Sequence, residues 1–208
     1  MKSIKLLIIS SLICALFPAV SFAEESDADA KAAIEAVAKN PKVIQYRKAE
    51  AAMAEKDFKK ASEILIPLAA EDYKSADDVT VRTVLGAKTI LGAMYFKGEG
   101  VERDINKGLG MIMEAAGQGF EQAKGLAAAL NKELATLGDE KAMYNVGYMC
   151  LKGWGGEQDP NMCIQWLEKA AENGHTKSAK ILSQIYTDGK YGIAPNKEKA
   201  TQYSGLAK

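Results

Sequence analysis

Histidine is the scarcest reactive residue of this 208-residue chain, because His175 is the only one. Hydrolases with a serine or cysteine nucleophile commonly use a histidine as general base, and histidine is also the commonest metal ligand. Every such site would have to include His175, which follows a glycine in a turn between two expected helices. We therefore expect no catalytic residues of this kind and no metal site.

Other catalytic and cofactor motifs are missing as well. No serine is followed three residues later by a lysine, so the penicillin-recognising serine motif is absent. A dinucleotide site needs three spaced glycines after a strand. The glycines here come in twos instead: Gly98 and Gly100, Gly108 and Gly110, Gly117 and Gly119. We expect these glycines to end helices or allow close packing, and we expect no bound cofactor.

An excess of charge of one sign is also missing. The chain has 27 basic and 27 acidic residues, which is not the balance of a nucleic-acid-binding protein. Residues 24–80 carry a surplus of acidic side chains, whereas residues 174–208 carry a surplus of basic ones. We interpret this as ordinary solvated surface. The alternative is a dipolar molecule whose ends steer a partner.

The N-terminus has the layout of a secretory signal peptide. Lys2 and Lys5 form a short basic start, residues 6–20 are mainly apolar, and small residues precede a cleavage point after Ala23. The apolar stretch is too short for a comfortable membrane span. Lipidation at Cys14 is disfavoured because Ile13, before it, is not small. We expect cleavage after Ala23 and export to the periplasm or beyond the cell.

A short pattern recurs four times in the rest of the chain. An Asp or Asn is followed four residues later by a small residue, and a segment rich in Leu and Ala begins there. The four pairs are Asp57 and Ala61, Asp104 and Gly108, Asp159 and Cys163, and Asn196 and Ala200. We expect the Asp or Asn to cap a helix by accepting backbone N–H bonds, and the small residue to mark a close approach of two helices. The composition predicts helix almost throughout.

Two longer copies of the pattern lie 55 residues apart. Residues 91–95 (Leu-Gly-Ala-Met-Tyr) precede a glycine turn in the first copy, as residues 146–150 (Val-Gly-Tyr-Met-Cys) do in the second. A capping Asp and then a pair of alanines follow in each. This pattern resembles the Sel-one-like repeat, a relative of the tetratricopeptide repeat. The resemblance covers about residues 46–208, and its clearest copies are Ala87–Gly119 and Ala142–Gly174.

The resemblance implies an all-α fold, a right-handed α/α solenoid of helix pairs. We expect a signal peptide at residues 1–23, an N-terminal segment with a capping helix at 24–45, and about four repeats at 46–208. Residues 120–137 fit neither half of a repeat and predict an irregular helical insert. Because such an array exposes an extended surface rather than a pocket, the expected function is binding.

Two cysteines remain after signal cleavage, Cys150 and Cys163. Each lies about one turn from the loop of an expected helical hairpin, where the two positions face each other. An oxidising compartment favours their pairing, so we predict a structural disulfide. Two free buried thiols are an alternative. A redox-active pair is another, disfavoured because the spacing is not Cys-x-x-Cys.

Four carboxylates, Glu71, Asp72, Asp77 and Asp78, cluster between the first two expected repeats. A calcium site or a general acid would need converging oxygens or raised pKa values, and the sequence indicates neither. We interpret the segment as a solvated linker.

The candidate partner-binding residues lie mainly on the first helix of each repeat, between its apolar positions. By the resemblance, this helix lines the concave face of the array, where exposed aromatic side chains supply binding hot spots. The candidates are Tyr144, Asn145, Tyr148, Trp154, Lys88 and Gln184. For Tyr144 and Tyr148, core packing is an equal alternative. Trp154 lies in a glycine turn, where we expect it either to shield the disulfide or to anchor a partner.

We therefore expect an exported protein that binds another protein, without a nucleic-acid partner or membrane insertion. Exported bacterial relatives, as the resemblance implies, include regulators that hold membrane sensors and immunity proteins that neutralise secreted toxins. A regulator or inhibitor that sequesters one partner is the leading hypothesis, because the chain is one short array. A cell-envelope scaffold without a dedicated ligand is the alternative. A β-lactam-interacting enzyme is a weaker one, since the regular cysteine spacing of such relatives is absent.

Overall fold

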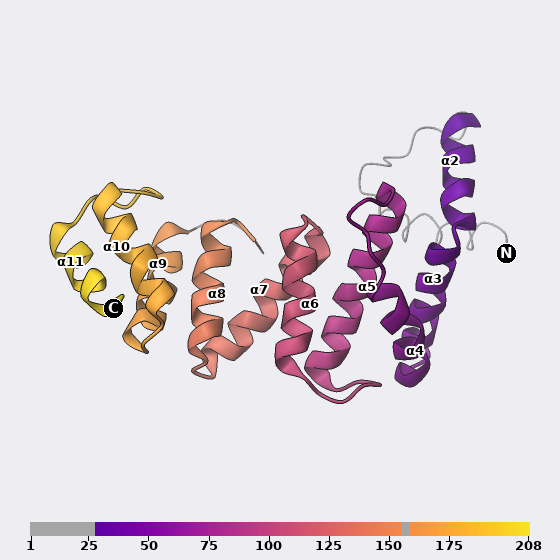
Figure 1. The fold of residues 1–208 in the computed structure, drawn as a ribbon, viewed down its shortest axis with the longest axis horizontal. Helices are drawn as coiled ribbons and strands as arrows, with labels where there is room; N and C mark the ends of the chain where they lie inside the picture. The colour runs from indigo at the N-terminus through magenta and orange to yellow at the C-terminus, as the bar shows by residue number, and fades with distance from the viewer. Residues whose placement is uncertain (1–27, 155–158) are drawn as a thin grey trace. The chain divides into compact units, whose positions relative to one another are not determined.

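Ten α-helices make up the described part of the chain. A computed structural model describes residues 28–154 and 159–208, and within these ranges there is no strand (Figure 1). The helices are α2 Ala28–Lys39, α3 Pro41–Ala54, α4 Phe58–Ala69, α5 Asp78–Lys97, α6 Ile105–Gly117, α7 Glu121–Thr136, α8 Glu140–Leu151, α9 Pro160–Glu172, α10 Thr176–Asp188 and α11 Lys197–Leu206. The all-α prediction is confirmed. The predicted signal peptide, with Cys14, lies outside the described residues, and no described helix has the length and apolar character needed to span a bilayer.

The predicted caps are confirmed at the starts of α4, α6, α9 and α11. In each case an oxygen of the capping side chain accepts a hydrogen bond from a backbone N–H two or three residues further on. The capping residues are Asp57, Asp104, Asp159 and Asn196. These bonds satisfy N–H groups that have no partner within the helix. At the other end of α5 and α10, Gly98 and Gly189 end the helix in the left-handed conformation, with φ of 80° and 70°.

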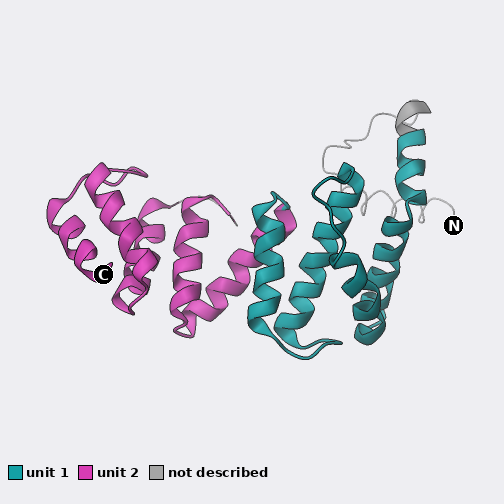
Figure 2. Cartoon of the chain, viewed as in Figure 1, with its two compact units in different colours: residues 1–120 teal, residues 121–208 magenta. Residues whose placement is uncertain are grey.

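The chain divides into two compact units, residues 1–120 and 121–208 (Figure 2). In unit 1, helices α3, α4 and α5 enclose a core in which Leu65, Leu68 and Met94 are almost fully buried. Helix α6 packs against α5. The phenol ring of Tyr46 lies against Gly86 of α5, so a glycine there makes room for the aromatic side chain of α3.

The close approach predicted at Gly108 is present between α5 and α6. A methyl group added at Gly108 would lie 2.5 Å from the backbone oxygen of Gly92 and 2.8 Å from the backbone nitrogen of Phe96. Such distances leave no room for a side chain. The two glycines therefore allow the backbones of α5 and α6 to touch.

Unit 2 consists of α7 to α11. Its core contains Leu167 of α9 and Leu182 and Ile185 of α10, all nearly inaccessible to solvent. The alanine pair Ala170 and Ala171 near the end of α9 is also buried. Small side chains at this point let α9 lie close to the helices before and after it.

Candidate partner-binding face

Helix α8 carries three of the predicted binding residues, all of them half-buried. The helix begins after Asp139, whose side chain accepts a hydrogen bond from the Ala142 backbone N–H at 2.8 Å. Its buried residues, among them Met149, face the core of unit 2. The half-buried residues between them are Tyr144, Asn145 and Tyr148.

Three rings stack in a row on this side of unit 2. The ring centroid of Tyr144 lies 5.9 Å from that of Tyr148, with the planes 25° apart, and 4.5 Å from that of His175, with the planes 30° apart. The ammonium group of Lys152 lies 5.6 Å from the Tyr148 ring centroid. Tyr144 also packs against the core of the unit. The two tyrosines are therefore partly packed against the core and partly exposed. The sequence had left core packing and exposure as equal alternatives, and each holds in part.

His175 joins this row to the next helix. Its Nδ1 accepts a hydrogen bond from the Ser178 backbone N–H at 3.3 Å and lies 3.0 Å from the Ser178 hydroxyl, so the imidazole caps α10. Burial lowers the pKa of His175 below its ordinary value; Glu140 opposes this shift, whereas Lys177 and Lys141 add to it. The capping nitrogen must be unprotonated to accept a bond, so a lowered pKa suits this role.

Asn145 is held inside unit 2. Its Nδ2 donates a hydrogen bond to Oδ1 of Asn131 on α7 at 2.8 Å, and Asn131 in turn donates to the Ala127 carbonyl. Asn131 is completely buried. The amide pair therefore fixes α8 against α7, because a buried amide without partners would be costly.

Trp154 and Gln184 are the remaining candidates in unit 2. Trp154 is half-buried in the turn after α8, where its backbone N–H donates to the Met149 carbonyl at 2.9 Å. Residues 155–158, which continue this turn, lie outside the described residues. Gln184 is exposed on α10, at the position that corresponds to Tyr148 in the preceding repeat.

Lys88, on α5, is the candidate that lies in unit 1. Its Nζ is 2.6 Å from Oε1 of Glu114 and 5.1 Å from the ring centroid of Tyr73, whose hydroxyl donates to the same oxygen. Partial burial alone would raise the pKa of Glu114, but the hydrogen bonds from Lys88 and Tyr73 outweigh it and hold that pKa below its ordinary value. Burial and Glu114 raise the pKa of Tyr73 to about 12. The charge of Lys88 is thus neutralised within unit 1, and its part in partner binding stays a prediction.

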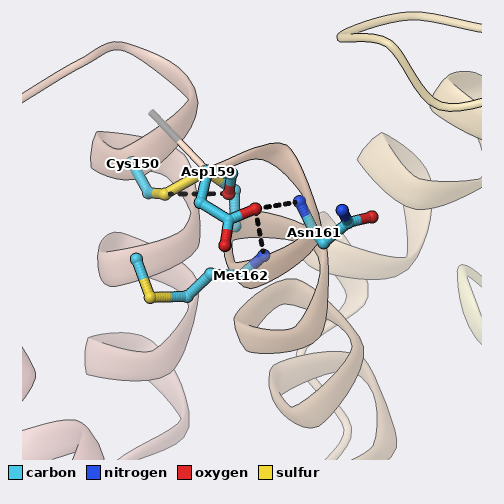
Figure 3. Close-up of a disulfide and its surroundings, with 5 residues drawn as sticks. Cys150, Asp159, Asn161 and Met162 are labelled. Carbon is cyan, nitrogen blue, oxygen red and sulfur yellow. Dashed lines mark hydrogen bonds between the residues drawn. A yellow bond between two sulfur atoms is a disulfide. The ribbon is translucent and has the colours of Figure 1, made fainter. Parts of the chain in front are cut away.

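A disulfide joins Cys150 of α8 to Cys163 of α9, with the two Cα atoms 5.3 Å apart. Asp159 caps α9 beside it, and one of its carboxylate oxygens accepts bonds from the backbone N–H groups of Asn161 and Met162 (Figure 3). Cys163 is fully buried and Cys150 is half-buried. The bridge ties the two helices of this repeat together next to their connecting turn.

Tyrosine takes the place of Cys150 in the neighbouring repeats. Tyr95 accepts a hydrogen bond from Nζ of Lys107 at 2.8 Å, and Tyr186 accepts one from Nζ of Lys199 at 3.0 Å. The ammonium groups lie 4.0 Å and 4.8 Å from the respective ring centroids. The middle repeat has no lysine at the matching position, so a disulfide replaces the tyrosine–lysine contact there.

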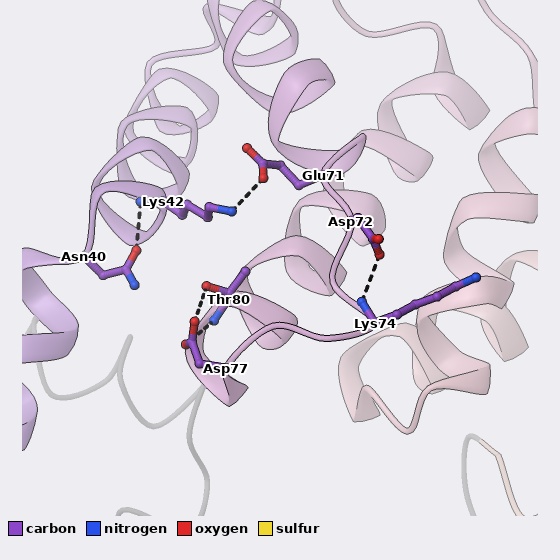
Figure 4. A network of polar contacts seen from close by, with 7 residues as sticks. All are labelled: Asn40, Lys42, Glu71, Asp72, Lys74, Asp77 and Thr80. Atoms are coloured by element: carbon purple, nitrogen blue, oxygen red, sulfur yellow. Dashed lines mark hydrogen bonds and ion pairs between the residues drawn. The ribbon is translucent and has the colours of Figure 1, made fainter.

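The carboxylates between α4 and α5 hold local structure. Asp77 accepts two hydrogen bonds from Thr80 and caps α5, and these bonds lower its pKa. Asp72 accepts a bond from a backbone N–H two residues on, and Glu71 forms an ion pair with Lys42 at 2.6 Å (Figure 4). Within the described ranges, no group of three His, Cys, Asp or Glu side chains is placed to hold a metal ion.

Sequence reasoning missed the role of His175 and the Asn131–Asn145 pair. The only sequence signal for the cap at His175 is the glycine turn before it, because histidine is not among the usual N-cap residues and no Glu or Gln stands three positions later. The amide pair had no local signal, because its members lie on different helices.

These features define an all-α protein built of helix pairs, each with a capped start. The Sel1 repeat family model matches residues 87–120, 140–175 and 177–207, which correspond to α5–α6, α8–α9 and α10–α11. The chain is therefore a Sel1-repeat protein, and such repeats generally serve as protein-interaction modules. Helices α3 and α4, which cover the start of the expected repeat region, lie outside the matched ranges.

Two solved structures are similar to this chain. One is a protective antigen present in uropathogenic Escherichia coli strains, which displays an SLR fold; it is 21% identical, with 83% of this chain and 39% of that chain covered and a TM-score of 0.37. The other is a Sel1 repeat protein from Oxalobacter formigenes, also 21% identical, with 78% and 67% covered and a TM-score of 0.37. This chain thus spans less than half the length of the antigen. A search of curated proteins found no match.

Proposed function

We propose that this protein is an exported binding module that sequesters one protein partner, and that the partner contacts the side of α8 bearing Tyr144 and Tyr148. The Sel1 repeats support the general role. The stacked, half-buried tyrosine pair carries the proposal for the site.

Several features favour these two rings as the contact. Tyrosine offers a large apolar surface together with a polar hydroxyl, and its side chain loses little conformational freedom on binding. Tyr144 is already held by its packing and by the stack with His175, so little ordering is left to the partner. Gln184 on α10 and Trp154 in the turn after α8 would extend the contact. Asn145, whose amide is bonded to Asn131, supports the helix from behind.

Export is the second part of the proposal. The signal-peptide pattern at residues 1–23 and the Cys150–Cys163 disulfide both fit an oxidising compartment. In that compartment the sequestering function has two specific forms: a regulator of a membrane sensor and an immunity protein against a secreted toxin. A scaffold with several weak partners is the alternative function, and a β-lactam-interacting enzyme is a weaker alternative.

Affinity capture from the native cell envelope tests this proposal. The bait is the tagged protein, compared with Tyr144→Ala/Tyr148→Ala and with Tyr191→Ala. Tyr191 is 44% exposed in the turn after α10 and serves as the control for removing a surface ring. The melting temperature of each variant shows whether the fold is retained.

We expect one dominant stoichiometric partner that the double variant loses and the control keeps. A toxin as partner would specify immunity, and a membrane sensor would specify regulation. Several weak partners, retained by both variants, would contradict the proposal and favour the scaffold.

A further inference from the structure

We infer that the partner binds this face through an acidic peptide segment, in which carboxylates flank an aromatic or apolar side chain. This inference rests on the proposed function and adds the chemistry of the partner. It is carried by four lysines around the tyrosine pair.

Two of these lysines lie at the ends of the tyrosine stripe, Lys141 in the first turn of α8 and Lys152 at its C-cap. Lys141, Tyr144, Tyr148 and Lys152 follow one another at spacings of three, four and four residues. At about 100° per residue these positions fall within roughly a quarter of the helix circumference. Lys141 and Lys152 are both exposed. The stripe therefore has an aromatic centre and a cationic group at each end.

The other two lysines lie on α10, the corresponding helix of the next repeat in the same unit. Lys177 and Lys180 correspond in the repeat alignment to Lys141 and Tyr144, and both are exposed. The stack between Tyr144 and His175, which caps α10, places the start of α10 beside the stripe on α8. The cationic groups thus lie at the two ends of the ring row and, on α10, beside it.

These ammonium groups are available to a partner. Among the residues that the structure describes, none of the four lysines forms an ion pair. The carboxylate of Asp188, further along α10, is paired with a different lysine, Lys190, at 2.7 Å. Among the charged groups that act on His175, the acidic Glu140 opposes Lys141 and Lys177. Within the described part of unit 2, the face therefore carries a net positive charge that no ion pair neutralises.

The spacing matches a short extended peptide. Lys141 and Lys152 are eleven residues apart, which corresponds to about 16 Å along a helix. An extended chain covers that length in about five residues, at roughly 3.3 Å per residue. Carboxylates about five residues apart, with an apolar side chain between them, would meet both lysines and the rings. Charges of this kind mainly raise the association rate and select the partner, whereas the rings supply most of the contact area.

Selection from a displayed library of random peptides of about 12 residues tests the inference without a known partner. The target is protein purified from cells that express the complete chain. The two variants are Lys177→Glu/Lys180→Glu and the control Lys132→Glu/Lys208→Glu, which makes the same change of net charge at exposed lysines elsewhere in unit 2. Tyr144→Ala/Tyr148→Ala reports whether a peptide binds at this face.

We expect the selected peptides to be enriched in Asp and Glu around an aromatic or apolar residue. Their affinity should fall about tenfold or more in Lys177→Glu/Lys180→Glu and less than about twofold in the control. It should also fall steeply between about 0.05 M and 0.5 M NaCl.

Enrichment of neutral or basic peptides that the tyrosine variant no longer binds would overturn the acidic partner but leave the proposed binding face intact. Selected peptides that bind the tyrosine variant as well as the unchanged protein would overturn both. Failure to enrich any peptide would also overturn the inference, because a linear segment would then not suffice.

Discussion

The imidazole of His175 stacks on the ring of Tyr144 at a centroid distance of 4.5 Å, while its Nδ1 caps α10 through Ser178. One side chain thus connects the face of α8 to the start of the next repeat. Because the cap requires an unprotonated nitrogen, the protonation state of His175 is coupled to the stability of unit 2.

This coupling predicts a dependence of stability on pH. Burial holds the pKa of His175 below 6.5 in the folded protein, so the unfolded chain binds a proton first as the pH falls. The stabilisation is therefore present above about pH 6.5 and is lost as the pH falls toward the folded pKa. The melting temperature should drop more between about pH 7.5 and pH 5.5 in the unchanged protein than in His175→Asn, which keeps a capping oxygen but does not titrate. Equal drops in the two proteins would contradict this role.

The disulfide is expected to contribute substantially to stability. Cys150 and Cys163 are 13 residues apart, and closing a loop of about this length stabilises a protein by roughly 3 kcal/mol in the chain-entropy model. Reductant should lower the free energy of unfolding by about 2–3 kcal/mol. In Cys150→Ala/Cys163→Ala, the control, reductant should have no effect. Mass spectrometry that finds both thiols free in protein from an oxidising compartment would refute the bridge.

Two glycines of α6, Gly108 and Gly110, allow a controlled test of the contact between α5 and α6 in unit 1. An added methyl group at Gly108 would meet the backbone of α5 at 2.5 Å, whereas one at Gly110 would have no neighbour within 4 Å. Gly108→Ala should destabilise the protein by about 1–3 kcal/mol because the helices must separate. Gly110→Ala should stabilise it by about 0.5–1 kcal/mol, since alanine favours the helix. Similar free energies of unfolding in urea for both variants would show that α5 and α6 do not touch here.

The buried amide pair predicts a non-additive effect of substitutions. Asn145→Ala leaves the Oδ1 of Asn131 buried without a donor, which should cost about 1–3 kcal/mol. Asn131→Leu/Asn145→Ala removes both polar groups and should cost less than the two single changes together. Additive costs in a double-mutant cycle would argue against the bond between α7 and α8. Asn145→Ala should leave partner binding nearly unchanged as long as the protein stays folded.

Features encoded by neighbouring residues could be predicted from the sequence. The caps at Asp104, Asp159 and Asn196 and the glycine turns depend on a few adjacent positions, so a single sequence reveals them. The contact at Gly108 could be predicted as well, because the small residue recurs at the same offset in each repeat.

Side-chain contacts between helices that no recurring position marks could not be predicted in this way. The ion pair of Lys88 with Glu114 arises because α5 packs against α6, and the pairing of Asn145 with Asn131 arises because α8 packs against α7. For the same reason, the sequence placed Lys88, Asn145 and Tyr148 in one set of binding residues. The structure distinguishes them: Lys88 and Asn145 have partners within their own units, whereas Tyr148 stacks on Tyr144 at a partly exposed face.

Site-specific photo-crosslinking in native cells tests the central claim most directly, namely that one partner binds the face of α8 and α10. A photoreactive phenylalanine analogue replaces Gln184, which is exposed on α10, or Glu133, which is exposed on α7. We predict one dominant cross-linked species from position 184, lost in Tyr144→Ala/Tyr148→Ala, and none from position 133. The same species from both positions, or a species from position 184 that persists without the tyrosines, would contradict the account.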